Sequence, residues 1–183
     1  MVSKLKHILE NGFILTGGPG TGKTTLIDKL EKMRYNTYPE IAKEKFKKNP
    51  MYTLNHPGIF FKEILDKYIS NYNSAKKLDI CFFDRGIPDL LAMIDILPYL
   101  NSAKRVSDNK ILKLSKKYRY GKVFLLDPLP NYNPKKHVNL TKEQSLIFHR
   151  FNIKRYKQLG YDLIPIPVGS VEDRVDMILN HIE

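Results

Sequence analysis

Short apolar runs alternate along this chain with segments in which apolar residues recur at helical spacing. The short runs are bounded by Gly, Pro, Asn or Asp, which is typical of buried strands. The predicted strands are 12–16, 35–38, 78–83, 123–126 and 164–167, the last at a sheet edge because prolines interrupt it. This alternation favours an α/β fold: a three-layer sandwich whose mostly parallel, five-stranded sheet has helices on both faces.

Helical patterns fill the segments between these strands. The predicted helices are 24–33, 41–48, one that opens at 57–58, one that opens at 88–89, 107–120, 141–159 and one that follows 170. The fifth is basic and is expected to end near Tyr120 and Gly121. Gly160 ends the sixth, as glycine often does at a helix C-terminus. Ser170 and Asp173 form a capping-box-like pair at the start of the last helix.

A glycine-rich motif lies between the first strand and the first helix. It fits the pattern G-x-x-x-x-G-K-[ST] and has the flanking strand and helix that the pattern requires. Its expected phosphate-binding residues are Gly17, Gly18, Pro19, Gly20, Thr21, Gly22, Lys23, Thr24 and Thr25. Backbone N–H groups and the helix dipole would bind phosphates, Lys23 would reach the outer ones, and Thr24 would ligate Mg²⁺. The motif predicts a nucleoside triphosphate site.

Asp84 and Arg85 end the predicted strand 78–83. An acid that follows four apolar residues at a strand end has the form of a Walker-B carboxylate, which holds Mg²⁺ beside Thr24. Arg85 could orient that carboxylate or bind a phosphate. The alternative is a solvated ion pair that only caps the strand.

Glu40 follows the predicted second strand, beside the same sheet edge. A carboxylate there can accept the proton of a substrate hydroxyl that attacks the γ-phosphate. The alternative is an acid that complements the dipole of helix 41–48 and has no part in chemistry.

Length and composition are those of an ordinary globular domain. The chain has 183 residues, of which 42% are hydrophobic, and we expect a single nucleotide-binding domain over residues 1–183. No apolar run is long enough to span a bilayer, and the N-terminus has no secretory core. The one cysteine, Cys81, lies in an apolar run and is expected to be a buried, reduced thiol. A cytoplasmic location is the expectation.

The formal net charge is +12, because 31 Lys and Arg residues outnumber 19 Asp and Glu residues. Such a balance suits anionic partners such as nucleotides or nucleic acid. Most of this charge is lysine between apolar residues, however, which is typical of solvated helix surface. Nucleic acid is therefore a possible partner that the sequence does not favour.

Six motifs together resemble the P-loop domain of the family that contains the nicotinamide-riboside kinase domain of NadR and related AAA-type ATP-binding domains. They are G-G-P-G-T-G-K-T-T, Y-P-E, F-F-D-R-G-x-P-D, L-L-D-P-L-P, L-G-Y and S-V-E-D-R-V. The resemblance implies a fold similar to nucleoside and nucleoside-monophosphate kinases. It also implies a base at Glu40 and an acid–arginine pair at Asp84 and Arg85.

One motif departs from the family pattern. Relatives tend to carry Asp-Gly-x-Arg in the lid-like segment at about 128–140, where this chain has none. Lys135 or Lys136 could supply the missing charge over the phosphates. Arg150 and Arg155, on the next helix, are substitutes.

Two further groups of residues, the bulky side chains near residue 60 and the histidines, need no functional role. Bulky residues at 59–61, together with Tyr68 and Tyr72, are expected to pack in the core, although they could wall a flat acceptor. The five histidines show no metal-ligand spacing, so no zinc site is predicted.

The leading functional hypothesis is an ATP-dependent phosphotransferase. Lys23 and the loop amides would stabilise the transferring group, Thr24 and Asp84 would hold Mg²⁺, and Glu40 would orient a hydroxyl of a nucleoside-like or other small acceptor. Two alternatives remain: a non-catalytic or slowly hydrolysing ATP- or GTP-binding switch, and a kinase of nucleic-acid ends. A guanine-specific GTPase is disfavoured because no N-K-x-D element occurs.

Overall fold

A computed structural model describes residues 7–50, 55–100, 106–136 and 140–182. Five strands form one parallel sheet in the order β2-β3-β1-β4-β5. The strands are β1 (His7–Thr16), β2 (Asn36–Tyr38), β3 (Cys81–Asp84), β4 (Tyr118–Leu126) and β5 (Leu163–Ile166). The α-helices are α1 (Lys23–Lys32), α2 (Ile41–Lys48), α4 (Pro57–Ala75), α5 (Asp89–Ile96), α6 (Asn109–Lys117), α7 (Lys142–Gln158) and α8 (Val171–Asn180), with 3₁₀ turns η1 (Leu97–Leu100) and η2 (Pro134–Lys136).

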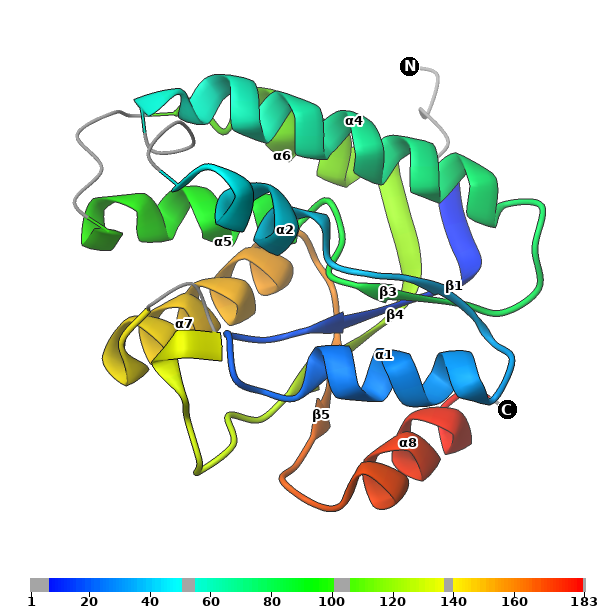
Figure 1. Ribbon diagram of the computed structural model, residues 1–183. Coiled ribbons are helices and arrows are strands. Elements are labelled where there is room, and N and C mark those ends of the chain that lie inside the picture. The colour runs from blue at the N-terminus through cyan, green and yellow to red at the C-terminus, as the bar shows by residue number, and fades with distance from the viewer. Residues whose placement is uncertain (1–6, 51–54, 101–105, 137–139, 183) are drawn as a thin grey trace.

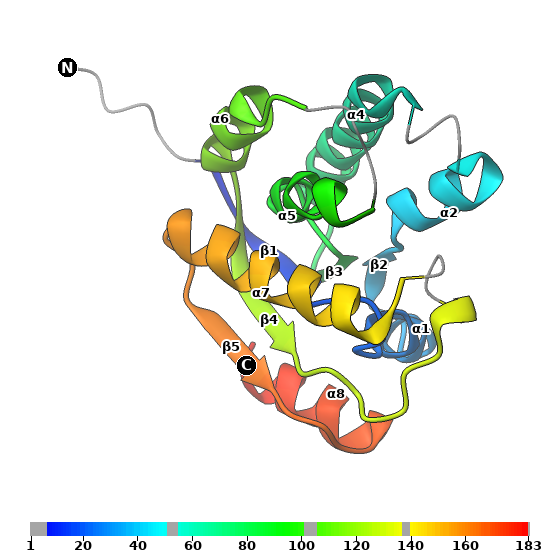
Figure 2. The same cartoon turned by 90° about the vertical axis from the view of Figure 1, so that its left-hand side faces the viewer.

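Helices cover both faces of the sheet, which confirms the predicted three-layer α/β fold (Figures 1 and 2). On one face, α1 and α8 pack against the sheet through Leu26, Leu30 and Ile178. On the other face, α4, α5 and α7 enclose a larger core that includes Ile64 and Leu90. Because all five strands are parallel, the residues that follow their carboxyl ends meet along one edge of the sheet.

The predicted end of the basic helix near Tyr120 is wrong. α6 ends at Lys117, and Tyr118 begins β4, where residues 118–120 pair with residues 7–9 of β1. Tyr72 of α4 packs edge-on against Tyr118 and Tyr120, with ring centroids 5.1 Å and 5.3 Å apart. These tertiary contacts override the helical spacing of the lysines, since aromatic residues fit a half-buried strand well.

Two strand starts also differ from the prediction. β1 begins at His7 and not at residue 12, with an irregular register between Leu9 and Phe13. β3 begins at Cys81 and not at residue 78. Residues 78–79 instead form a turn whose carbonyl oxygens accept hydrogen bonds of 2.7 Å from the Asn11 amide. A side chain 67 residues away thus occupies the groups that a strand would need.

Other local predictions are confirmed. Gly160, predicted to end the helix, has a φ of +72° after the end of α7. Thr141 and Gln144 also form a capping box at the start of α7, which was not predicted. Ser170 accepts a hydrogen bond from the Asp173 N–H at 3.0 Å. Cys81 is a buried free thiol, and burial raises its pKa to about 11. No helix within the described ranges is long and apolar enough to cross a membrane.

Candidate functional site

The glycine-rich loop joins β1 to α1 at the carboxyl edge of the sheet. Gly17, Gly20 and Gly22 have φ values of +135°, +79° and +86°, a region that other residues rarely adopt. A Cβ on Gly17 would also lie 2.8 Å from the Leu126 carbonyl oxygen. The protein backbone therefore requires glycine at these positions, independently of any phosphate.

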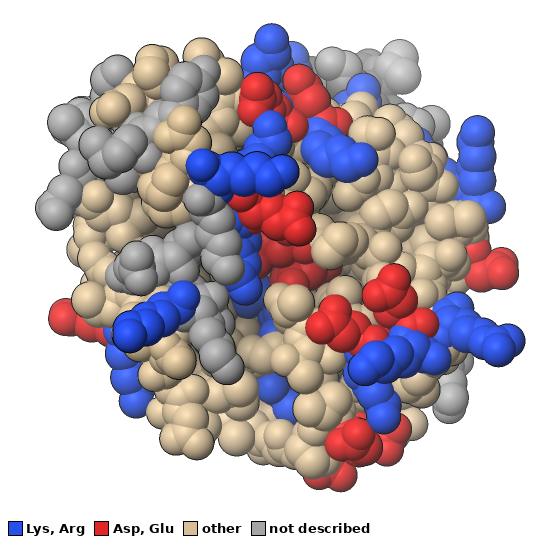
Figure 3. Space-filling view, viewed as in Figure 1, with Lys and Arg blue, Asp and Glu red and all other residues tan. Residues whose placement is uncertain are grey.

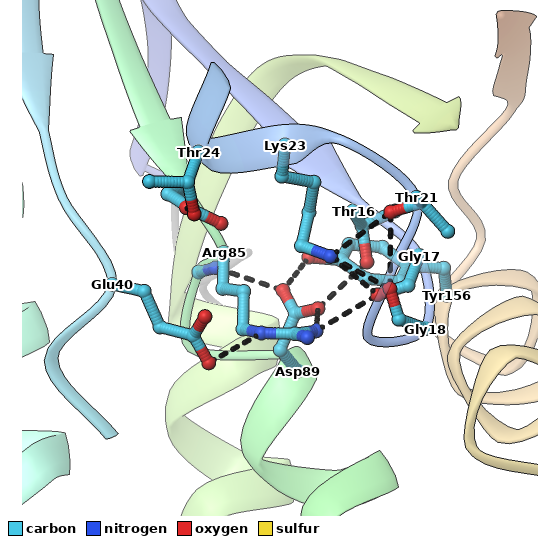
Figure 4. Close-up of polar contacts among 12 residues, drawn as sticks. Thr16, Gly17, Gly18, Thr21, Lys23, Thr24, Glu40, Arg85, Asp89 and Tyr156 are labelled. Carbon is cyan, nitrogen blue, oxygen red and sulfur yellow. Dashed lines mark hydrogen bonds and ion pairs between the residues drawn. The ribbon is translucent and has the colours of Figure 1, made fainter. Parts of the chain in front are cut away.

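Lys23 lies beneath this loop and is buried. Its ammonium donates hydrogen bonds to the carbonyl oxygens of Gly17 and Gly18 at 3.0 Å and 2.8 Å, and to the Thr21 hydroxyl at 3.1 Å (Figure 4). Burial, reinforced by the positive charge of Arg85, lowers the pKa of Lys23 to about 8. The ammonium is thus held against the inner side of the loop, within reach of an anion that the loop amides would bind.

Thr24 and Asp84 meet where α1 begins and β3 ends. The Thr24 hydroxyl donates to Asp84 Oδ2 at 3.0 Å, while the buried Asp84 Oδ1 has no hydrogen-bond partner among the described residues. Burial and the nearby Glu40 raise the pKa of Asp84 to about 6, although Lys23 and Arg85 oppose the shift. An unpartnered carboxylate oxygen beside a hydroxyl matches the oxygen ligands of Mg²⁺, which usually takes few protein ligands.

Arg85 connects the loop to two carboxylates. Its Nε donates to Glu40 Oε1 at 2.9 Å, and one terminal nitrogen donates to the Gly17 carbonyl at 3.0 Å and to Asp89 Oδ1 at 3.3 Å. The residue has a φ of +74°, and its N–H donates to the Leu15 carbonyl. Burial alone would lower the pKa of this guanidinium, but Glu40 and Asp89 outweigh burial and raise it. A strained, buried arginine held by several partners is typical of a functional site.

Asp89 is a residue of the site to which the sequence analysis gave no role, although it lies in the motif F-F-D-R-G-x-P-D and at a predicted helix start. It is fully buried and accepts four hydrogen bonds, from the Thr16 hydroxyl at 2.6 Å, the Gly86 N–H at 2.8 Å, the Tyr156 hydroxyl at 2.5 Å and Arg85. The available signal was the motif F-F-D-R-G-x-P-D, which ends at Asp89, four residues after Arg85. Asp89 fixes the position of Arg85.

Glu40 precedes α2 but makes no side-chain cap to that helix. Its carboxylate turns toward Arg85, and its side chain is 16% exposed. Burial alone would raise the pKa of Glu40, but Arg85 and Lys23 outweigh burial and hold the pKa below its ordinary 4.5. The helix-dipole interpretation therefore does not describe where this side chain lies.

Two helices far along the chain support the loop, and the sequence analysis predicted the helices but not these contacts. From α7, the Ser145 hydroxyl donates to the Pro19 carbonyl at 2.6 Å, and His149 Nδ1 accepts from the Gly18 N–H at 3.2 Å. From α8, buried Arg174 donates to the Thr21 carbonyl at 2.9 Å. These contacts hold the loop backbone in place.

The lid candidates lie away from this group of contacts. Lys135 is exposed on η2, and Arg150 is exposed on α7. The Lys136 side chain lies outside the described residues. Arg155 forms ion pairs with Asp95 and Asp108, so it ties α7 to other helices.

A cavity of about 300 Å³ opens beside the loop. At one end it is lined by Lys23, Thr24, Glu40 and Arg85. The rest of its wall is largely apolar and includes Phe60 and Phe61 from the cluster at 59–61, whereas Tyr68 and Tyr72 are buried in the core. Part of this cluster therefore lines the cavity, as a wall for an acceptor would, and part of it packs in the core.

Comparison with known proteins agrees with this geometry. A family model described as an AAA domain matches residues 12–174, and no curated protein matches the chain. Deoxyadenosine kinase from M. mycoides with bound dATP has a TM-score of 0.68 at 17% identity, covering 93% of this chain and 98% of that one. Thymidylate kinase from Ehrlichia chaffeensis has a TM-score of 0.63 at 12% identity, covering 94% and 98%.

NadR in complex with NR has a TM-score of 0.71 at 13% identity. The match covers 93% of this chain and 49% of NadR, so this chain spans about half the length of that protein. These similarities confirm the expected nucleoside-kinase-like fold and the resemblance from which it was predicted.

Proposed function

The chain belongs to the AAA domain family, and on that premise we propose that it is a P-loop kinase that transfers the γ-phosphate of ATP to a hydroxyl of a small molecule. One observation carries the proposal. A single cavity is lined both by the phosphate-binding loop and by Glu40 and Arg85, so donor phosphates and an acceptor hydroxyl can share it. A site that only bound a nucleotide would need no carboxylate at that end of the cavity.

Binding of ATP would use the loop amides, with Lys23 against the outer phosphates. Thr24 and Asp84 would hold Mg²⁺, and the unpartnered Asp84 Oδ1 supports that assignment. When bound, Mg²⁺ would neutralise charge on the phosphate oxygens. Arg85 would stabilise negative charge on the transferring group, because its guanidinium is already fixed beside the loop by the Gly17 carbonyl and Asp89.

Glu40 would orient the acceptor hydroxyl and take its proton. The lowered pKa of Glu40 makes it a weak base, but phosphoryl transfer has a loose transition state in which the nucleophile needs little activation. A weak base therefore suffices to take the proton, provided that the hydroxyl is well positioned. The ion pair with Arg85 fixes the Glu40 carboxylate and so supplies that positioning.

The test compares the full wild-type chain with its Glu40→Gln variant. Transfer of phosphate from γ-labelled ATP is measured for each member of a panel of compounds that carry a hydroxyl. Glutamine keeps an acceptor for Arg85 but cannot take a proton, so we expect kcat to fall by about 10²-fold or more while the Kd for ATP changes little. Glu44→Gln, at an exposed acid on α2, the helix that Glu40 precedes, is the matched control. Wild-type turnover in the Glu40→Gln variant would remove Glu40 from the mechanism.

A further inference from the structure

The cavity wall beyond the phosphate-binding loop is apolar. It combines residues from α2, α4, α5, η1 and α7 with one loop position, Leu140: Ala42, Phe46, Pro57, Phe60, Phe61, Met93, Ile96, Leu97, Leu100, Leu140 and Phe148. Four of these are phenylalanines, and Phe60 and Phe61 pack edge-on with centroids 5.5 Å apart. Aromatic side chains offer a flat ligand large contact areas without hydrogen-bond partners.

Six polar side chains line the cavity among the described residues: Lys23, Thr24, Thr25, Glu40, Lys43 and Arg85. Lys23, Thr24, Glu40 and Arg85 belong to the contacts at the phosphate-binding loop, and the charge of Lys43, like those of Lys23 and Arg85, lowers the pKa of Glu40. Charge is thus concentrated where the phosphoryl group would move.

The contrast between the polar groups at the loop and the apolar wall restricts which acceptor molecules the cavity can bind. A nucleobase presents several donors and acceptors along its edge, and each one buried against this wall without a partner would weaken binding by about tenfold. An apolar ring loses nothing there, because it exchanges water for matching apolar surface. Sites that discriminate for a polar group do so with a buried polar partner, which the described wall does not offer.

We propose that the acceptor is an alcohol whose hydroxyl is carried on an uncharged, apolar, ring-sized body, and not a nucleoside. The inference rests on the proposed kinase function and specifies its substrate class. The acceptor oxygen forms a bond to the γ-phosphorus while the bond between that phosphorus and the β,γ-bridging oxygen breaks. The hydroxyl proton goes to the Glu40 carboxylate, and ADP leaves with the electron pair of the broken bond.

The experiment compares two groups of acceptors with the full chain, Mg²⁺ and γ-labelled ATP. The apolar group is 2-phenylethanol and cyclohexanemethanol, and the polar group is adenosine, thymidine and nicotinamide riboside. We expect kcat/KM to be at least about tenfold higher for the better apolar alcohol than for any nucleoside, as one unpaired buried polar group would produce. A nucleoside preferred by tenfold would overturn the substrate class and leave the kinase function standing.

Variants of the wall test the same point independently of turnover. Phe60→Asn places an amide in the wall and should weaken binding of 2-phenylethanol by about tenfold, measured by calorimetry with a non-hydrolysable ATP analogue present. Ile59→Asn is the matched control, since Ile59 is on the same helix but 46% exposed and outside the cavity. Phe46→Asn, on the partly exposed wall of α2, serves if Phe60→Asn fails to fold.

The outcomes separate the two proposals. Suppose that Phe60→Asn or Phe46→Asn weakens binding of 2-phenylethanol and Ile59→Asn does not, but no acceptor of either group is phosphorylated. That outcome would refute the kinase function but retain the apolar ligand site. Equal binding by all variants, or no binding to the wild type, would overturn the apolar site itself.

Discussion

Asp84 combines a functional position with a cost to folding. Its carboxylate is buried with one oxygen unpartnered, and burial raises its pKa from 3.8 to about 6. The folded state therefore binds more protons than the unfolded state between these pH values, so the contribution of Asp84 to stability falls as pH rises through this window. Above it, the ionised carboxylate destabilises the metal-free protein.

The prediction is that Asp84→Asn raises stability at about pH 7.5 when Mg²⁺ is removed with a chelator. The gain should be on the order of 1 to 3 kcal/mol, since asparagine cannot ionise and still accepts from Thr24. With Mg²⁺ and ATP present, the wild type should gain stability and the variant should gain much less. Thermal unfolding measures both effects, and Asp28→Asn, at an exposed position on α1, is the control. If Asp84→Asn were less stable than the wild type in the presence of chelator, this account would be contradicted.

His149 ties a protonation state to the shape of the loop. Its Nδ1 accepts from the Gly18 N–H, which requires a neutral ring nitrogen there. Burial, with the charges of Lys23 and Arg85 against the opposing Asp127, lowers the pKa of His149 below 6.5. The hydrogen bond from the Gly18 N–H to His149 is therefore present at pH values above the lowered pKa and is lost as the pH falls through it.

We expect the Kd for ATP to rise steeply at acidic pH in the wild type and less steeply in His149→Asn, whose amide oxygen can accept from Gly18 without titrating. His149→Ala should bind ATP about tenfold more weakly at all pH values. Calorimetric titration across about pH 5 to 8 tests this. Parallel pH profiles for the wild type and His149→Asn would show that another group is responsible.

At the scale of elements, what could be predicted depended on sequence separation. The loop from Gly17 to Thr25, the glycine that ends α7 and the cap of α8 involve neighbours in sequence, and their patterns were sufficient. The contacts of Asp89 with Thr16 and of Arg174 with Thr21 join residues 73 and 153 positions apart. No local pattern predicts such pairs, because they depend on how helices pack across the finished sheet.

The boundary between α6 and β4 shows the same limit. The lysines of the basic segment are spaced as on a helix up to Lys117, and the pattern predicts residues 118–120 as the last turn of that helix. The deciding contacts come from β1 and from Tyr72, and a Cβ on Gly121 would lie 2.4 Å from the Glu10 carbonyl oxygen. Close strand pairing, and not helix termination, is what requires glycine there.

α8 should support nucleotide binding although it does not line the cavity. Arg174→Met keeps the aliphatic stem but removes the hydrogen bond to the Thr21 carbonyl, so we expect about tenfold weaker ATP binding and a loss of about 1 to 3 kcal/mol in the free energy of unfolding. Calorimetry and urea unfolding measure the two effects. Asp176→Asn, exposed on the same helix, should change neither, and an unaltered Kd in Arg174→Met would make Arg174 a packing residue only.

For the whole molecule, the net charge of +12 gives less information than its distribution. Lys and Arg side chains alternate with Asp and Glu on the face seen in Figure 3. Several basic side chains are held in ion pairs: Lys29 with Glu172, Lys45 with Glu63, and Arg155 with two aspartates. Positive charges that are paired, or interspersed with negative ones as on this face, attract a polyanion more weakly than an unbroken basic surface, because neighbouring negative charges offset them within a Debye length.

This distribution predicts how the chain responds to RNA. A protein that follows a nucleic-acid backbone neutralises many phosphates, and its affinity then falls steeply with salt. Here we expect only weak binding of a 20-nucleotide RNA, with no saturable binding at about 150 mM salt and a log–log salt slope no steeper than about −3. Fluorescence anisotropy measures the affinity for RNA and its salt slope, and the Kd for ATP over the same salt range is the internal control.

Because the ATP site is buried beside fixed loop amides, its affinity for ATP should change far less with salt than the affinity of an exposed basic surface for RNA. Micromolar RNA binding at about 150 mM salt with a slope near −6 would instead favour a kinase of nucleic-acid ends, in which the lysine-rich surface forms part of the substrate site.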